Sequence, residues 1–314
     1  MADPWTRKGQ LVSPSDVVGS YRLLQAPCCW ELSNGLLRIA VAARDEHNRA
    51  HAVCLDVDPE ANMKIRRIDR VPTLSPERVP GATSIGLSSV VRLDDGRLRA
   101  YGAILWLTSR DYQISIFCAE SDDEGATFSE PRIVLPSDRN NDLPVLSAFV
   151  VRSDAEWRMW YTAFESWRHL PGKAPDSRYG IRHARSADGL TWELDEGFAL
   201  AWRSGSETGI ISSSVVADGG QYEMWTSRRG PYSDADPSLR RYRIVRATSA
   251  DGTAFSFDDA APVFDPASAT GSWENEMQCY PHLFRSEGRP DILLYCGNGY
   301  GATGIGWAVR ARPR

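Results

Sequence analysis

Acidic, basic and aromatic residues that could act on a small molecule recur near the ends of strand-like segments in this chain of 314 residues. For proton transfer, the best-placed candidates are Glu207, Glu276 and His282. The candidates for substrate binding are Arg44, Asp45, Glu165, Trp167, Arg229, Tyr280, Asn298 and Tyr300. Aromatic faces combined with carboxylates and guanidinium groups suit sugars or an anionic group on a ligand. Any one of these residues could lie on a solvated surface, but their recurrence at equivalent positions favours a site.

Two other kinds of motif have structural explanations. The segments SADGLTW, from Ser186, and SADGTAF, from Ser249, place Asp-Gly between predicted strands, where Gly accepts a positive φ and Asp caps the local backbone. We therefore predict that they are tight turns. The segment GNGYGATG, from Gly297, contains a GxGxxG pattern, but the residues after it predict a strand where a dinucleotide site requires a helix.

The cysteines and histidines do not have metal-ligand spacing. The cysteines are Cys28, Cys29, Cys54, Cys118, Cys279 and Cys296, which lie mostly inside apolar runs and form no CxxC pair. The five histidines form no HExxH pattern. We therefore expect six reduced, buried thiols and neither a metal nor another cofactor.

The charge and the apolar content of the chain limit the kinds of partner that it can bind. Lys and Arg number 36 against 41 Asp and Glu, and the resulting formal charge of −5 argues against nucleic acid and anionic membranes. No run of about 18 apolar residues is present. The opening segment MADPWTRKGQLVSPSD also lacks the apolar stretch of a signal peptide, so the expected compartment is the cytoplasm.

Internal repeats are the strongest signal in the sequence. The segments AESDDEGATF, ARSADGLTW and ATSADGTAF begin at Ala119, Ala184 and Ala247, which are 65 and 63 residues apart. A step of 65 residues back from Ala119 reaches Cys54, and a step of 61 forward from Ala247 reaches Ala308. Each of these positions follows or lies in an alternating, strand-like segment, so the chain contains five units.

Each unit can be divided into four strands, and helical periodicity is nearly absent. Repeated four-stranded units that cannot bury both faces alone predict an all-β fold, a five-bladed β-propeller with antiparallel blades, forming a single domain over residues 1–314. The fifth unit is one strand short, because only ARPR follows WAVR. The segment from Trp5 to Val12 is predicted to supply that strand; the alternative is a frayed N-terminus.

The S-x-D-G-x-x-W turn, the R-M-W-Y and E-M-W pairs, and the segment from Trp273 to Val309 resemble the five-bladed propeller glycosidases. This superfamily includes arabinanases, levansucrases and invertases of glycoside hydrolase families 43 and 32. The resemblance implies an axial funnel with three carboxylates near the starts of the innermost strands. This sequence departs from that pattern: Ala26 and Ile211 stand near positions where Asp and Glu are expected, and GATSIGLSSVV offers no clear acid.

The leading functional hypothesis is an intracellular carbohydrate-active enzyme, a glycosidase-like hydrolase or transglycosylase acting on a small-molecule or sugar-containing substrate. Glu207 and Glu276 would be its acid and base, with Glu165 and Glu274 in reserve. Two alternatives remain: a biosynthetic tailoring enzyme that catalyses a lyase, cyclisation or group-transfer step, and a sugar-binding propeller without catalysis. In each case the site is expected where the inner strands end, at the mouth of the axial funnel.

Overall fold

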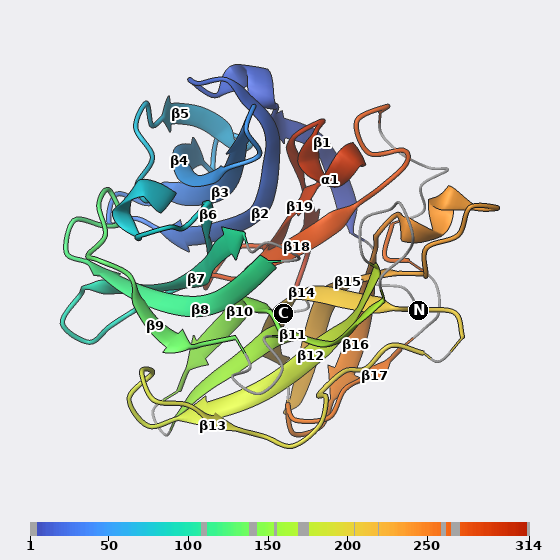
Figure 1. The fold of residues 1–314 in the computed structure, drawn as a ribbon. Coiled ribbons are helices and arrows are strands. Elements are labelled where there is room, and N and C mark those ends of the chain that lie inside the picture. The colour runs from blue at the N-terminus through green and yellow to red at the C-terminus, as the bar shows by residue number, and fades with distance from the viewer. Residues whose placement is uncertain are drawn as a thin grey trace.

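The computed structural model describes residues 5–107, 112–137, 143–153, 156–168, 176–203, 205–218, 220–258, 262–264 and 271–312. Its strands form a five-bladed β-propeller, as predicted (Figure 1). Blade 1 contains β2 (Tyr21–Glu31), β3 (Leu37–Asp45), β4 (Ala50–Asp58) and β5 (Lys64–Ile68). Blade 2 contains β6 (Ser84–Arg92), β7 (Leu98–Leu107), β8 (Tyr112–Ser121) and β9 (Arg132–Leu135).

The other blades have the same order. Blade 3 contains β10 (Val145–Arg152), β11 (Trp157–Arg168), β12 (Asp176–Ser186) and β13 (Glu193–Leu194). Blade 4 contains β14 (Gly209–Asp218), β15 (Gln221–Arg229), β16 (Arg243–Ser249) and β17 (Ser256–Phe257). Blade 5 contains β18 (Cys279–Phe284), β19 (Asp291–Cys296) and β20 (Ile305–Arg310). The described helices are short: η1 (Pro14–Asp16), η2 (Pro76–Arg78), η3 (Pro237–Arg240) and α1 (Asn298–Gly301).

The first strands of the blades, β2, β6, β10, β14 and β18, are innermost and contact one another in a closed ring. The strands predicted to be third in each unit are β4, β8, β12, β16 and β20, and they contain Cys54, Ala119, Ala184, Ala247 and Ala308. The repeat spacing therefore identified the correct strand in every blade. Hydrophobic clusters fill the boundaries between successive blades, because each blade must cover the apolar face of its neighbour.

The N-terminal strand completes blade 5. Strand β1 (Thr6–Val12) pairs antiparallel with β20, from Thr6 opposite Val309 to Val12 opposite Ile305. This confirms the predicted closure, in which the start of the chain supplies the missing outer strand, and excludes a frayed segment over these residues. The first and last parts of the described chain are thus hydrogen-bonded within one blade, and the ring cannot open without breaking this pairing.

The repeated Asp-Gly segments are structural turns, as predicted. The hydroxyls of Ser186 and Ser249 accept hydrogen bonds from the N–H groups of Gly189 and Gly252, both at 2.9 Å. The carbonyls of these turns then bind the preceding blade, since the Tyr101 hydroxyl donates to Gly189 and the Trp160 indole donates to Gly252, both at 2.8 Å. The turns therefore fasten blade 3 to blade 2 and blade 4 to blade 3.

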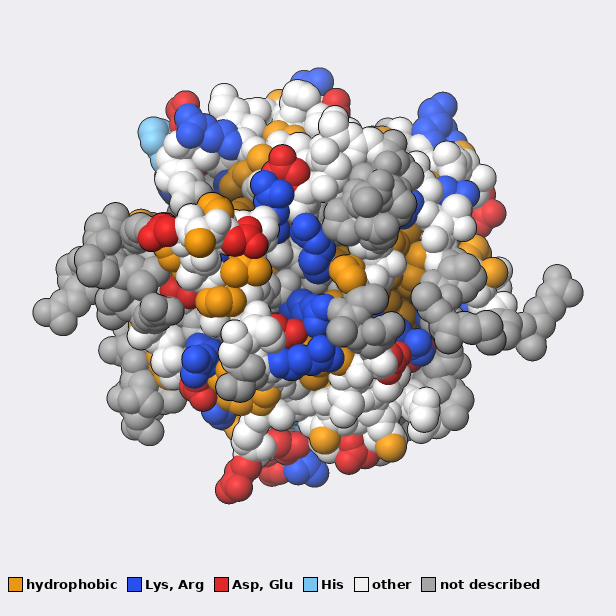
Figure 2. Space-filling view, turned by 90° about the vertical axis from the view of Figure 1, so that its right-hand side faces the viewer, with side chains coloured by type: hydrophobic (Ala, Val, Ile, Leu, Met, Phe, Trp, Pro, Cys, Tyr) orange, Lys and Arg blue, Asp and Glu red, His pale blue; other side chains and the backbone are white. Residues whose placement is uncertain are grey.

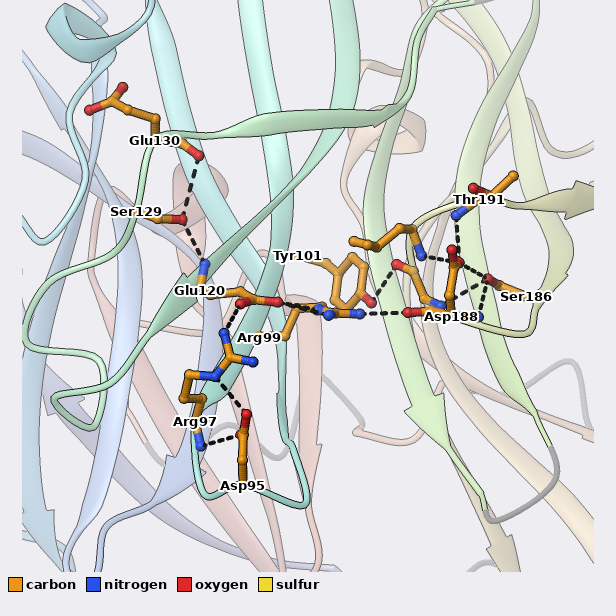
Figure 3. A network of polar contacts seen from close by, with 12 residues as sticks. Asp95, Arg97, Arg99, Tyr101, Glu120, Ser129, Glu130, Ser186, Asp188 and Thr191 are labelled. Atoms are coloured by element: carbon orange, nitrogen blue, oxygen red, sulfur yellow. Dashed lines mark hydrogen bonds and ion pairs between the residues drawn. The ribbon is translucent and has the colours of Figure 1, made fainter.

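Figure 3 shows this contact between blades 2 and 3. Arg99 of β7 is hydrogen-bonded to Glu120 of its own blade and donates to the carbonyl of Asp188 in the next blade at 2.6 Å. The Arg99 guanidinium thus links the Glu120 carboxylate of blade 2 to a turn of blade 3. The Gly189 carbonyl of that turn also accepts a hydrogen bond from the Tyr101 hydroxyl. Between blades 4 and 5 the ring of Trp225 takes a corresponding place, 6.0 Å from Trp5 and 4.8 Å from the Arg310 guanidinium.

All six cysteines lie within the described residues and are free and buried, as predicted. Burial raises the pKa of the Cys54 thiol to about 12, so this group stays protonated at neutral pH. Within the described ranges, no helix combines the length and the apolar character needed to cross a bilayer.

Deleting residues 1–12 should destabilise the whole ring, because it removes β1 and leaves the edge of β20 unpaired. We expect the free energy of unfolding to fall by at least about 3 kcal/mol. Urea unfolding of this truncation, with deletion of residues 1–4 as the matched control, measures the effect. Equal stability of the two truncations would contradict closure by β1.

Candidate functional site

Each innermost strand carries a β-bulge at an equivalent position part-way along its length. The bulges therefore separate the part of the ring near the strand starts from the part near the strand ends. The register shifts lie between Gln25 and Cys28, Leu87 and Ser89, Leu146 and Phe149, Ile211 and Ser214, and Cys279 and His282. A bulge bends the strand and re-aims its side chains. We call the end of the ring where the innermost strands begin the start face, and the opposite end the end face.

An aromatic cluster spans blades 2 to 5 at the start face. Its members are Tyr112 of β8, Phe164 and Trp167 of β11, Tyr179 of β12, Tyr242 directly before β16, Tyr280 of β18 and Tyr300 of α1. Phe164 stacks on Tyr179 with ring centroids 4.8 Å apart. Tyr112 lies 5.0 Å from Trp167, and Tyr242 lies 5.7 Å from Tyr280. The hydroxyls of Tyr179 and Tyr242 are hydrogen-bonded, which joins the two halves of the cluster.

Arg229 fixes the centre of this cluster. Its Nη1 lies 2.9 Å from a carboxylate oxygen of Asp176, and its Nε donates to the Tyr179 hydroxyl at 2.6 Å. The Arg229 side chain is buried, so the ion pair is protected from solvent. Burial raises the pKa of Tyr242 well above its usual value, although the nearby Arg229 opposes that rise. The Tyr242 phenol therefore remains a neutral hydrogen-bonding group at physiological pH.

Arg44 reaches the same face from the end of β3 in blade 1. Its Nε donates to Gln25 Oε1 at 2.6 Å, and its Nη1 donates to the carbonyl of Asn48 at 2.8 Å. Burial lowers the pKa of Arg44, while Tyr280 and Tyr112 lie close enough for their phenols to oppose that shift. The predicted residues Arg44, Trp167, Arg229, Tyr280 and Tyr300 are thus brought to one face, which lies where the innermost strands begin and not, as predicted, where they end.

Three predicted binding residues contact other groups of the protein: Asp45 its own loop, Glu165 the neighbouring strand, and Asn298 the loop before β18. Asp45 Oδ1 accepts hydrogen bonds from the backbone N–H groups of His47 and Arg49, at 2.9 and 2.8 Å. Glu165 is exposed, and its carboxylate lies 3.8 Å from Arg178. Asn298 Oδ1 accepts from the N–H groups of Glu276 and Met277, at 2.8 and 2.9 Å. Asn298 therefore positions the loop that carries Glu276.

The two predicted catalytic acids have different surroundings. Glu207 is buried, lies 2.9 Å from Arg228 and accepts a hydrogen bond from the N–H of Arg203. The Glu276 side chain is 54% exposed and lies 3.0 Å from Arg241. Among the described residues, no hydrogen bond or ion pair joins the two carboxylates. Their assignment as an acid and base pair stays a prediction.

Basic side chains gather on the side of the ring that carries β15 and β16 (Figure 2). There, Lys and Arg side chains run down the middle of the surface with hydrophobic side chains beside them. Of the arginines of blade 4, Arg241 is exposed and Arg228, Arg240 and Arg243 are half-buried, whereas Arg229 is buried. Arg228 and Arg241 pair with Glu207 and Glu276, so this blade carries charges of both signs.

His282 lies deeper along the axis, in a cavity of about 480 Å³ that the ends of all the innermost strands line. Its Nε2 accepts a hydrogen bond from the N–H of Cys29 at 3.0 Å. At two other blade boundaries, the Ser89 and Ser214 hydroxyls accept in the same way from Val150 and Leu283, at 3.1 and 2.8 Å. The structure therefore gives His282 a fastening role between blades 5 and 1, whereas its catalytic role stays a prediction.

The sequence alone did not reveal Tyr112, Phe164, Tyr179, Tyr242 and Gln25 as site residues. The sequence did contain a signal for three of these residues. Tyr112, Tyr179 and Tyr242 each stand shortly before the alanine that begins a repeated segment, which is Ala119, Ala184 or Ala247. Gln25 carries no such signal, since its role depends on contact with Arg44.

No protein-family model matches the chain. It is 29% identical over 317 residues to the uncharacterized protein Rv1502 of Mycobacterium tuberculosis strain H37Rv, and the alignment covers 97% of this chain and 98% of that protein.

Solved structures show the fold. A structure described as a complex of BT0996 and RGII is similar with a TM-score of 0.70 and 16% identity, covering 99% of this chain and 92% of that protein. The α-L-arabinofuranosidase PaAbf62A of Podospora anserina in complex with cellotriose has a TM-score of 0.67 and 11% identity, covering 99% and 98%. A thermostable family-43 glycoside hydrolase has a TM-score of 0.65 and 14% identity, covering 95% and 92%. The chain therefore has the five-bladed propeller fold of these glycoside hydrolases, as its sequence resemblance predicted.

Replacing His282 with Gln should make stability less sensitive to acid. Burial lowers the pKa of His282 to about 4, from 6.5 in the unfolded chain. Between these pH values the unfolded chain binds a proton that the folded chain excludes, so the folded state loses stability as pH falls from 6.5 to 4. The loss amounts to about 3 kcal/mol. The glutamine amide of the variant would accept from the N–H of Cys29 without titrating.

Urea unfolding of the parent protein and the His282→Gln variant at pH 7.5, 6, 5 and 4 measures this difference. His47→Gln is the control, because His47 is exposed. Parallel stability curves for the parent and the His282 variant would rule out the neutral, fastening histidine.

Proposed function

We propose that this protein is a carbohydrate-active propeller that binds a sugar-containing small molecule at the aromatic cluster of the start face. The observation that carries the proposal is the union of rings from blades 2 to 5 with the guanidinium groups of Arg44 and Arg229. The apolar face of a sugar packs on aromatic rings, and its hydroxyls bond to phenols and guanidinium groups. The partly exposed rings that can meet such a ligand are those of Tyr112, Trp167, Tyr280 and Tyr300, which pack against the buried Phe164, Tyr179 and Tyr242.

The comparisons support the ligand class. Two structures with the same fold are described as complexes with RGII and with cellotriose, which are carbohydrates. Those ligands belong to those proteins. The shared fold favours a related class of ligand for this chain, because site residues in a propeller come from the same strand ends in every blade.

Hydrolysis or transglycosylation by Glu207 and Glu276 has weaker support. Glycoside cleavage usually needs two carboxyl groups about 5 to 10 Å apart with no competing partners. Here Glu207 and Glu276 each pair with a different arginine. One observation favours Glu276 as an acid or base: Asn298 holds its backbone, and its side chain reaches solvent. Among the described residues, no contact favours the lyase, cyclase or group-transfer alternative.

We also propose that the protein works in the cytoplasm. Six free, buried thiols support this compartment, because oxidising compartments favour disulfides.

Replacing Trp167 with Ala should weaken sugar binding by about 10-fold or more, because the ring packs on Tyr112 and Phe164 within the aromatic cluster. Trp192→Ala is the matched control: Trp167 lies opposite Ser177 near the start of β12, whereas Trp192 follows the end of that strand. Titration calorimetry with the tightest binder from a panel of mono- and oligosaccharides measures both variants. Equal losses in the two variants, or none in Trp167→Ala, would reject the aromatic cluster as the sugar site.

Replacing Glu276 with Gln separates binding from hydrolysis. We expect sugar affinity to stay within about 3-fold, because Asn298 contacts the backbone of Glu276 and the substitution preserves that contact. If Glu276 is an acid or base, hydrolysis of aryl glycosides should fall by about 100-fold or more. Unchanged hydrolysis would exclude Glu276 from proton transfer, and lost affinity would place it in the binding site.

A further inference from the structure

We propose that the ligand of the start face carries an anionic group, a carboxylate or a phosphate on the sugar, which binds to Arg44. This inference rests on the proposed function and names the class of sugar. Its basis is the set of partners around Arg44, all of which are neutral: the side-chain oxygens of Gln25, Asn48 and Ser84 and the carbonyl of Asn48.

The buried arginines Arg38 and Arg229 have carboxylate partners. Arg38 donates to both oxygens of Asp56 at 2.7 and 2.9 Å, and Arg229 pairs with Asp176. A guanidinium removed from water is costly unless an anion compensates its charge. Arg44 is partly buried, and among the described residues no ion pair compensates it.

The acid next to Arg44 in sequence does not fill this role. Oδ1 of Asp45 is taken by the N–H groups of His47 and Arg49, and Oδ2 lies 3.4 Å from His51 Nε2. Burial accordingly lowers the pKa of Arg44, with only partial opposition from Tyr280, Asp45 and Tyr112. The charge therefore remains available to a ligand.

Arg44 also retains the donors that an anion requires. Its Nε is used by Gln25 and its Nη1 by Asn48 and Ser84, while Nη2 has no acceptor among the described residues. The Arg44 side chain as a whole is only partly buried. Its two N–H groups can donate to the oxygens of a carboxylate or phosphate. Tyr112 and Tyr280 lie nearby, so a sugar attached to that anion would meet the aromatic cluster.

The substitution Gln25→Glu tests this inference within the folded protein. It keeps the size of the side chain and places a carboxylate on Arg44 Nε, where Gln25 Oε1 now accepts at 2.6 Å. The built-in carboxylate should neutralise Arg44 and repel an anionic ligand. Gln221→Glu is the matched control. Gln221 is exposed at the start of β15, so this substitution adds the same negative charge near the end face, away from Arg44.

The probes are galactose, galacturonate and galactose 6-phosphate, with the corresponding glucose series, measured by titration calorimetry. For the parent and Gln221→Glu, we expect an acidic form to bind at least about 10-fold tighter than its neutral sugar. Gln25→Glu should reduce that preference below about 2-fold, because its carboxylate competes with the anionic group for Arg44. Arg44→Lys, which keeps the charge and loses the planar fork, should lose most of the preference. The tighter of the two acidic forms identifies the anionic group.

The outcomes separate this inference from the proposed function. Equal affinity for neutral and acidic sugars in the parent protein, or an unchanged preference in Gln25→Glu, would overturn the anionic ligand and leave sugar binding intact. If the parent protein binds none of the neutral or acidic sugars, both the anionic ligand and the proposed function are overturned.

Discussion

The contact of the five innermost strands around one axis is the constraint on which this site depends. Arg44, Tyr112, Trp167, Tyr242 and Tyr280 come from five different blades, and only the closed ring brings them to one face. The ring is closed by the pairing of β1 with β20, and the Ser-Asp-Gly turns fasten successive blades. The stability of the ring and the geometry of the candidate site therefore depend on the same contacts between blades.

The two ends of the ring use polar residues differently. At the start face, phenols and guanidinium groups form one hydrogen-bonded group around Arg229. Deeper along the axis, polar side chains fasten blades, and His282 accepts from Cys29 just as Ser89 accepts from Val150. A polar group near the axis of a propeller can thus satisfy a backbone N–H that would otherwise be buried without a partner. His282 therefore has a structural role, and its catalytic role stays a prediction.

The fold was largely predictable from the sequence because a fixed repeat determines the blades. The spacing from Ala119 to Ala184 and Ala247 located the third strands, and the shortage of one strand after Ala308 indicated that the N-terminus completes the ring. Local sequence also predicted the Asp-Gly turns. The site was less predictable, since residue type does not show what a side chain contacts: Asp45 binds its own loop, and Asn298 binds the loop that carries Glu276. The contact of Gln25 with Arg44 requires the pairing of β2 with β3 and the bulge in β2.

Charge explains how this site could differ from a two-carboxylate hydrolase site. Ala26 stands in the bulge of β2, next to Gln25, and the resemblance to propeller glycosidases places an Asp at that position. The hydrogen-bond partners of Arg44 are neutral oxygens, and the nearby Asp45 carboxylate accepts from the backbone of its own loop. The proposed binding of an anionic sugar rests on these neutral partners of Arg44.

The most direct test of the central claim is a crystal structure of the protein soaked with the tightest-binding acidic sugar. We expect the ligand to lie on the start face, with its anionic group at Arg44 and its ring against Tyr112 or Trp167. A ligand in the axial cavity beside Phe149 and His282 would contradict this, because that cavity lies beyond the bulges, at the other end of the ring.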